Sequence, residues 1–124
     1  MKRTFMLPWP PSNNHYWGTR DKYRYLTERG KQYREDVLAA CYQAYCGKPA
    51  IMRSAVKITI EAQPPDRRAR DLDNLLKAPL DALAKAGVFI DDKQVDDLRI
   101  YRAGIVPGGR LMITIEATSG QTDD

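Results

Sequence analysis

Apolar and polar residues alternate between positions 55 and 62 of the chain. Every second residue from Val56 to Ala62 is apolar, and the residues between them are lysine, threonine and glutamate. A period of two is typical of a β-strand that buries one face and exposes the other. The pattern therefore predicts a half-buried strand over residues 55–62.

Three further segments favour strands. Residues 4–7 form a short stretch that ends at a cluster of three prolines, which cannot donate hydrogen bonds to a β-ladder. Residues 95–103 and 111–117 are strand-like and are separated by a Pro-Gly-Gly turn at residues 107–109. Such turn residues indicate a hairpin-like connection, so we expect the last two strands to be neighbours.

Two segments carry helical periodicity. From residue 33 to residue 45, apolar side chains recur at helical spacing, and the segment ends near Gly47 and Pro49. From residue 72 to residue 83, the leucines fall on one helical stripe that is closed by Gly87. Pro79 lies inside this stripe, where a proline loses a backbone hydrogen bond and usually kinks the helix.

These elements follow the order β-α-β-α-β-β. The order predicts an α+β fold of two layers, in which the two main helices cover one face of a mixed β-sheet. A chain of 124 residues with 43% hydrophobic and 29% charged content falls within the range of one compact domain. We therefore expect residues 1–124 to form a single domain.

The sequence gives no sign of a membrane or an export segment. No stretch approaches the ~20 apolar residues that a membrane-spanning helix requires, and the start of the chain has no long apolar run. The spacing of Cys41 and Cys46, the two cysteines, fits no zinc or redox motif. We expect a cytoplasmic protein with reduced cysteines and no membrane partner.

Charge is distributed unevenly along the chain, although the net charge is only +4. Eleven of the 20 basic side chains but only five of the 16 acidic ones lie in residues 1–62. A basic half that attracts phosphates beside an acidic half would fit a protein that acts on a polyanion. Ordinary surface charge explains the same numbers, so composition alone does not decide between these readings.

Asp71 and Asp73 lie two positions apart, after three arginines and before the leucine stripe. Residues two apart point to nearly opposite sides of an α-helix, so the carboxylates converge only if Asp71 lies outside it. Asp71 is a favourable N-cap, and Asp73 would follow in the first turn, where the helix dipole stabilises an ionised carboxylate. Ionised carboxylates are also what Mg²⁺ requires. A helix cap and a metal site are therefore both open.

Three more charged residues could join these aspartates. Lys77 follows Asp73 by four positions, so it either forms a surface ion pair or contacts a phosphate on the same face. Asp91 and Asp92 lie in a turn after the predicted helix, and a return of the chain could bring one of them near Asp71. The alternative is that they only stabilise the turn, where aspartate is favoured.

The chain lacks the residues for several other kinds of chemistry. His15 is the only histidine, and no serine or cysteine lies in a nucleophile motif, which argues against nucleophilic catalysis. No glycine-rich phosphate-binding motif is present, so we expect no small-molecule cofactor. Trp9, Tyr16 and Trp17 either pack a proline-rich loop onto the core or stack on exposed bases of a distorted nucleic acid.

Four stretches of the sequence, taken in order, resemble one known family. They are LPWPPSNNHYW near the start, PDRRARDLDNLLKAPLDAL in the middle, AGVFIDDKQV after it and GGRL near the end. They resemble the RusA family of Holliday junction resolvases, and the similarity covers nearly the whole chain. The resemblance implies a homodimeric, Mg²⁺-dependent endonuclease that resolves four-way DNA junctions by paired nicks during recombination and repair, with Mn²⁺ as a substitute ion.

The resemblance also implies roles for individual residues. Carried over by position, the essential metal-binding carboxylates are Asp71, Asp73 and Asp92, and Lys77 is their basic partner in catalysis. Asp91 would lie near the site. We expect DNA to be bound by Arg67, Arg68, Arg70, Asn13, Asn14, Lys22 and Arg24. Two alternatives stay open, which are a non-catalytic DNA-binding protein and a metal-dependent nuclease without preference for junctions.

Overall fold

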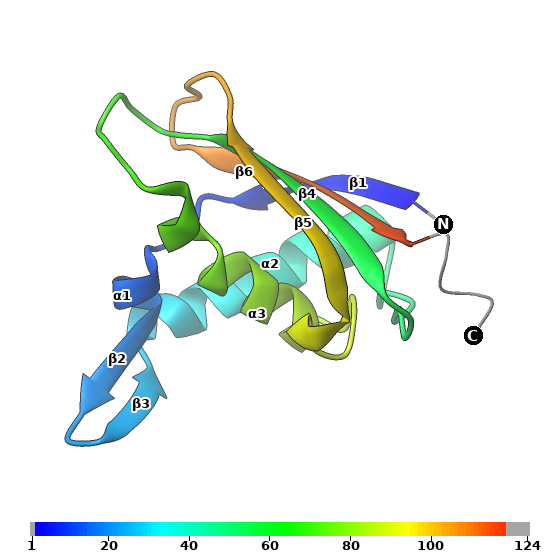
Figure 1. The fold of residues 1–124 in the computed structure, drawn as a ribbon, viewed down its shortest axis with the longest axis horizontal. Coiled ribbons are helices and arrows are strands. Elements are labelled where there is room, and N and C mark those ends of the chain that lie inside the picture. Colours follow the sequence, from blue (N-terminus) through cyan, green and yellow to red (C-terminus); the bar gives the residue numbers. More distant parts are fainter. Residues whose placement is uncertain (1, 119–124) are drawn as a thin grey trace.

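The computed structural model describes residues 2–118 and is built around a four-stranded mixed β-sheet (Figure 1). The strands are β1 (Lys2–Pro8), β4 (Val56–Gln63), β5 (Val95–Arg102) and β6 (Arg110–Ala117). They lie in the order β1-β6-β4-β5. β4 and β5 run parallel, whereas β6 runs antiparallel to both of its neighbours. The four strands predicted from the sequence are all present.

β4 and β6 occupy the interior of the sheet because their alternating sequences bury one face. In β4, Val56, Ile58 and Ile60 are fully buried, and the residues between them are half-buried. β6 repeats this pattern with Leu111 and Ile113. The two strands pair along their whole length. The half-buried strand predicted over residues 55–62 is therefore confirmed.

The predicted hairpin between the last two strands is wrong, because β4 lies between β5 and β6. β5 is a mostly exposed edge strand, while β6 has the buried alternation that a central strand needs. Beyond β5, the chain continues beside the end of β4, where the amide of Ala103 donates to the carbonyl of Ala62 at 2.8 Å. The turn at residues 107–109 does form, with Gly108 and Gly109 at positive φ, but it carries the chain across β4.

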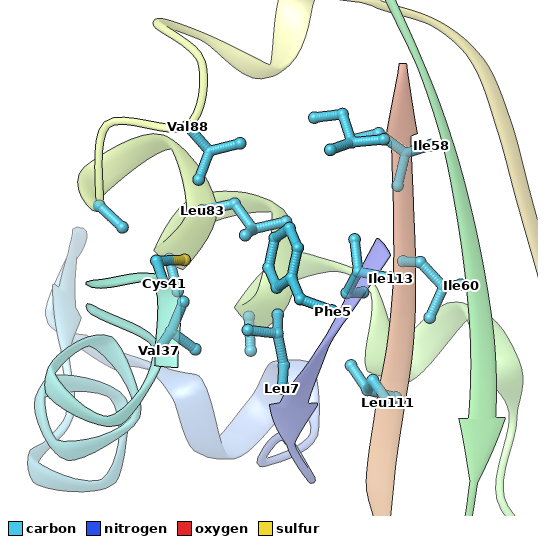
Figure 2. Close-up of a cluster of buried hydrophobic side chains, with 14 of the residues drawn as sticks. Phe5, Leu7, Val37, Cys41, Ile58, Ile60, Leu83, Val88, Leu111 and Ile113 are labelled. Carbon is cyan, nitrogen blue, oxygen red and sulfur yellow. The ribbon is translucent and has the colours of Figure 1, made fainter. Parts of the chain in front are cut away.

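Two helices, α2 (Glu28–Tyr45) and α3 (Lys77–Lys85), cover one face of the sheet (Figure 1). Figure 2 shows Val37 and Cys41 of α2 and Leu83 of α3 pointing toward Phe5 and Ile113 of the sheet. The α+β fold with two layers and both main helices on one face is therefore confirmed. Among the described helices, none is long and apolar enough to cross a lipid bilayer.

The helix predicted over residues 72–83 is divided in two. A short 3₁₀ helix, η1 (Leu72–Leu75), comes first, and α3 begins only at Lys77. Pro79 is consequently the third residue of α3 and lies in the first turn, where a backbone N–H has no partner within the helix. The proline therefore fits the observed helix without loss of a hydrogen bond, and the expected kink is replaced by a break before Lys77.

The sequence pattern does not predict three short elements between residues 13 and 26. These are α1 (Asn13–Tyr16), β2 (Trp17–Arg20) and β3 (Tyr23–Leu26). β2 and β3 form a separate two-stranded sheet that projects from the body in Figure 1. Asp21 has a left-handed φ of 58° in their tight turn, a conformation that aspartate tolerates. Segments of four residues contain too few periods to be recognised from hydrophobic pattern.

Candidate active site

A cavity of about 590 Å³ lies where α1, α3, the base of the β2–β3 hairpin and the turn before β5 meet. Its charged and polar lining includes Asn13, Arg24, Asp73, Lys77, Asp81, Lys85, Asp91 and Asp92. The sequence had singled out Asp73, Lys77 and Asp92 as site residues, and the fold brings all three to this one cavity. Acidic and basic groups therefore share its walls.

Asp73 and Lys77 lie on either side of the break between η1 and α3. Asp73 occupies the first turn of η1, and Lys77 is the first residue of α3. Within residues 2–118, neither side chain takes part in a hydrogen bond or an ion pair, and the surface ion pair considered between them does not form. Both charges are therefore left for groups that enter the cavity.

Asp71 lies outside regular helix, as predicted, at the N-cap position of η1 with φ −82° and ψ 130°. Its side chain makes no capping hydrogen bond. It lines two neighbouring cavities of about 490 and 450 Å³ instead of the cavity that holds Asp73 and Asp92. Among residues 2–118, no three acidic, histidine or cysteine side chains are grouped closely enough to hold a metal ion. Asp73 and Asp92 thus line one cavity, and Asp71 lines the two cavities beside it.

The turn that carries Asp91 and Asp92 is held by reciprocal capping. It forms a short 3₁₀ helix, η2 (Asp92–Gln94), in which the Asp91 carboxylate accepts from the Lys93 amide at 2.9 Å. Gln94 accepts from the Asp91 amide at 3.0 Å, and its own amide group donates to the carbonyl of Met52 at 2.9 Å. The Asp91 carboxylate is therefore used to hold its own turn, and this turn fixes the position of Asp92 in the cavity wall.

Asp91 and Asp92 differ in pKa because of these contacts. The Lys93 amide lowers the pKa of Asp91, since it donates to the ionised carboxylate. The neighbouring Asp91 carboxyl raises the pKa of Asp92 through a hydrogen bond, and partial burial raises it further. Two carboxylates so close together disfavour a second negative charge. A cation in the cavity would relieve this repulsion.

Sequence reasoning missed a partly buried ion pair at the wall of the same cavity. The guanidinium of Arg34 in α2 donates to Oδ2 of Asp81 in α3 through Nε at 2.8 Å and Nη2 at 2.7 Å. The hydroxyl of Tyr16, a fully buried residue of α1, donates to the same oxygen. Burial and the Asp81 carboxylate raise the pKa of Tyr16 well above its usual range. Since Tyr16 is enclosed, packing onto the core is confirmed for it, and stacking on bases is excluded.

The arginines before η1 are of two kinds. Arg67 and Arg68 are exposed, and the Arg68 guanidinium makes a long, exposed contact of 3.7 Å with Asp66. Arg70 is held in place, because its guanidinium donates to Asp66 at 2.8 Å and lies 5.6 Å from the ring centre of Trp9. The Arg70 guanidinium lowers the pKa of Asp66 to about 2. Arg67 and Arg68 are therefore better placed than Arg70 to contact a polyanion.

The remaining four residues predicted to bind DNA lie in α1 and the hairpin. Lys22 and Arg24 are exposed, and the Arg24 guanidinium stacks 4.2 Å from the ring centre of Trp17 at the cavity wall. Asn14 is exposed, whereas Asn13 is half-buried and bonded to the backbone of Asp73 and Lys77. Nothing in the sequence distinguished the two asparagines, because only the fold determines which amide meets the helix break.

The cavity holds four carboxylates, with the exposed Arg24 at its wall and the exposed Arg67 and Arg68 in the adjoining cavity. Carboxylates that can hold a divalent ion beside basic groups that can bind phosphates are typical of an enzyme that cleaves nucleic acid. Comparison with known proteins gives the same class, because the family model described as endodeoxyribonuclease RusA matches residues 8–116. The chain therefore belongs to the RusA family of endodeoxyribonucleases.

Curated relatives match nearly the full length of the chain. The crossover junction endodeoxyribonuclease of Enterobacteria phage HK97 is 45% identical over 111 residues, which cover 90% of this chain and 91% of that protein. The corresponding protein of Escherichia coli strain K12 is 46% identical over 109 residues, or 88% of this chain and 89% of the relative. The enzyme of Enterobacteria phage 82 is 45% identical over 109 residues, with the same shares.

Proposed function

We propose that this protein is a Mg²⁺-dependent endonuclease that resolves four-way DNA junctions by paired phosphodiester hydrolysis. The observation that carries the proposal is the cavity in which Asp73, Asp92 and Lys77 meet without an ion pair among themselves within the described residues. Membership of the RusA family supports the reaction, and the names of the relatives support the junction as substrate.

The donor set of the cavity fits a hard divalent cation. Mg²⁺ commonly takes one or two carboxylates and completes its shell with water and substrate phosphates. Asp73 and Asp92 supply two carboxylates in one cavity, so a cluster of three protein ligands is not required. We assign these two as metal ligands and, on the DLDN motif, Asp71 as the third. Mn²⁺ prefers the same oxygen ligands and should replace Mg²⁺.

When bound, the ion would supply the chemistry of water activation and of stabilising the leaving 3′ oxygen. The protein supplies position and charge. η1 holds Asp73 and the capped turn at Asp91 holds Asp92, so both carboxylates are presented by ordered backbone. Lys77, at the start of α3, would place a positive charge beside the phosphate as negative charge develops on it.

DNA would be held by basic groups at the cavity and at the adjoining one. Arg67 and Arg68 are exposed before η1, and Lys22 and Arg24 are exposed on the hairpin. Contacts of these side chains with phosphates would position the strand without reading its sequence, and they would make binding strongly dependent on salt. We propose this path for the DNA backbone.

We also propose that the active form is a homodimer. A junction is symmetric and must be nicked in two strands, so two sites related by a twofold axis match its geometry. Light scattering of the protein in dilute solution should give a mass of twice 14.1 kDa. A mass near 14.1 kDa at the concentration used for cleavage would contradict this part of the proposal.

The experiment that tests the function compares a four-way junction with a duplex and a single strand of the same sequence. Each is incubated with the protein in Mg²⁺, in Mn²⁺ and in a chelator. We expect paired nicks in the junction alone, and only when a divalent ion is present. Binding without cleavage in Mg²⁺ would instead identify a DNA-binding protein, and equal cleavage of the duplex would identify a nuclease without junction preference.

A further inference from the structure

The side chain of Asn13 is inserted into the break between η1 and α3. Its Nδ2 donates to the backbone carbonyl of Asp73 at 3.2 Å, and its Oδ1 accepts from the backbone amide of Lys77 at 3.2 Å. In an uninterrupted α-helix the amide of residue 77 would donate to the carbonyl of residue 73. The Asn13 amide therefore takes the place of one helical hydrogen bond and satisfies both of its partners.

This insertion gives a physical reason for the division of a segment that the leucine periodicity predicts as one helix. A side chain that enters the ladder of backbone hydrogen bonds is a known cause of breaks and kinks in helices. The Asp73 carbonyl still accepts a weak 3₁₀ bond from Leu76 at 3.4 Å, so the chain before the insertion is tighter than an α-helix. Asp73 and Lys77 consequently do not stand one turn apart on one helix.

The element that delivers Asn13 is anchored independently of the break. The hydroxyl of Tyr16 at the end of α1 bonds Asp81, and its carbonyl accepts from the Thr27 hydroxyl at 3.0 Å. A Cβ atom at Gly30 would lie only 2.5 Å from this carbonyl, so α1 is packed tightly against the start of α2. Asn13 therefore reaches the break from a fixed support.

We propose that Asn13 is a positioning residue that sets the relative placement of Asp73 and Lys77 by holding the helix open between them. The proposal rests on the proposed function, because Asp73 is a proposed metal ligand and Lys77 is the residue proposed to place a positive charge beside the phosphate. It assigns the Asn13 amide to the protein backbone instead of to DNA. The exposed Asn14, one position further on, has no such contact within residues 2–118.

The test separates chemistry from binding. In Asn13→Ala, the amide of Lys77 can bond the Asp73 carbonyl directly and close the helix. We expect the single-turnover cleavage rate at saturating protein to fall on the order of 10²-fold, as for a misplacement of about 1 Å, while junction affinity changes less than about twofold. Gln43→Ala, which truncates an exposed amide side chain of α2 outside the cavity, is the control and should leave both the cleavage rate and the junction affinity unchanged.

A second readout uses neither DNA nor metal. In metal-free buffer, the ¹³Cα chemical shifts of residues 73–77 should move toward α-helical values in Asn13→Ala and stay unchanged in Gln43→Ala. This readout distinguishes the two proposals. If the parent protein cleaves no junction but the shifts move, the proposed function is wrong, and the proposed role of Asn13 in holding the helix open is right.

Asn13→Asp is a second variant, included in case Asn13→Ala does not fold. It keeps an acceptor for the Lys77 amide, a favourable contact at the start of α3, but it has no donor for the Asp73 carbonyl. We expect it to be folded and to retain more of the cleavage rate than Asn13→Ala does. Weaker junction binding with an unchanged cleavage rate in either Asn13 variant, or unchanged shifts in Asn13→Ala, would overturn the proposal.

Discussion

Two aspartates of the same cavity, Asp81 and Asp73, have opposite electrostatic surroundings. Oδ2 of Asp81 accepts from Nε and Nη2 of Arg34 and from the hydroxyl of Tyr16, so its charge is compensated inside the protein. Asp73 has no ion-pair partner within residues 2–118, and Asp92 across the cavity lies beside another carboxylate. The comparison separates a carboxylate that holds the fold together from carboxylates that need a cation from outside.

The difference follows from the elements that supply each partner. Asp81 lies in the middle of α3, where it meets α2 and α1 in the packed part of the molecule. Asp73 and Asp92 lie in short 3₁₀ segments, and although Lys77 of α3 shares their cavity, neither carboxylate forms an ion pair within residues 2–118. Charges that are close together and uncompensated are typical of functional sites, where a ligand offsets them.

The largest expected effect is on cleavage by Asp73→Asn. The substitution keeps the shape of the side chain but removes the charge that a divalent ion requires. We expect the nicking rate in Mg²⁺ to fall by orders of magnitude, while the free energy of unfolding changes by about 1 kcal/mol or less. Single-turnover nicking assays and urea denaturation measure the two quantities.

Asp97→Asn is the control for this prediction, because Asp97 is an exposed aspartate of β5 outside the cavity. In metal-free buffer, Asp73→Asn should bind the junction as tightly as the parent protein or more tightly, since a carboxylate that repels phosphates has been removed. Weaker binding would argue against this electrostatic account.

The second effect concerns stability and should be seen with Asp81→Ala. The substitution leaves the Arg34 guanidinium and the Tyr16 hydroxyl without their acceptor. Breaking a buried ion pair typically destabilises by 3–5 kcal/mol, and about 25% exposure of the Asp81 side chain reduces this to about 2–3 kcal/mol. Urea denaturation measures this loss. In the control Asp97→Ala, the free energy of unfolding should change by less than about 0.5 kcal/mol.

A smaller effect is expected for Tyr16→Phe, which removes one of the three donors to Asp81 and keeps the packed ring. Because the hydroxyl also accepts from Nε of Arg34 at 3.0 Å, the substitution removes two hydrogen bonds and should lower the free energy of unfolding by about 1–2 kcal/mol. Tyr23→Phe serves as control, because Tyr23 is 77% exposed. If the two variants unfold at the same urea concentration, the Tyr16 hydroxyl contributes nothing to the compensation of Asp81.

The smallest effect is a pH dependence at a second compensated carboxylate, Asp66. Arg70 lowers the pKa of this carboxyl from 3.8 to about 2. A lowered pKa in the folded state means that the contribution to stability is present above about pH 4 and is lost as the pH falls through about 2. The melting temperature should therefore fall less between pH 5 and pH 2 in Asp66→Asn than in the parent protein. Thermal unfolding at a series of pH values measures this difference.

Much of the fold could be predicted from hydrophobic periodicity alone. The β4 strand and both main helices have enough periods to be recognised, and their apolar stripes define a two-layer core. Which strands are neighbours could not be predicted, because β5 and β6 are close in sequence but β4 fits between them. The hairpin of β2 and β3 could not be predicted either, since its strands have only four residues each.

The candidate site was predicted less completely than the fold. The resemblance to the RusA motifs identified Asp73, Lys77 and Asp92, and the structure brings these three to one cavity. Spacing could not show that Asp91 caps its own turn or that an asparagine from α1 would open the helix before Lys77. Both depend on contacts between segments far apart in the sequence, which only the folded chain makes.

The most direct test of the central claim is to locate a divalent ion in crystals soaked in Mn²⁺, by anomalous diffraction. We predict a peak with oxygen ligands from Asp73 and Asp92, and no peak at Asp81, whose charge is already compensated by Arg34. A peak that contacts Asp81, or saturating Mn²⁺ without any peak at Asp73 and Asp92, would contradict the claim that the cavity holds its cation there.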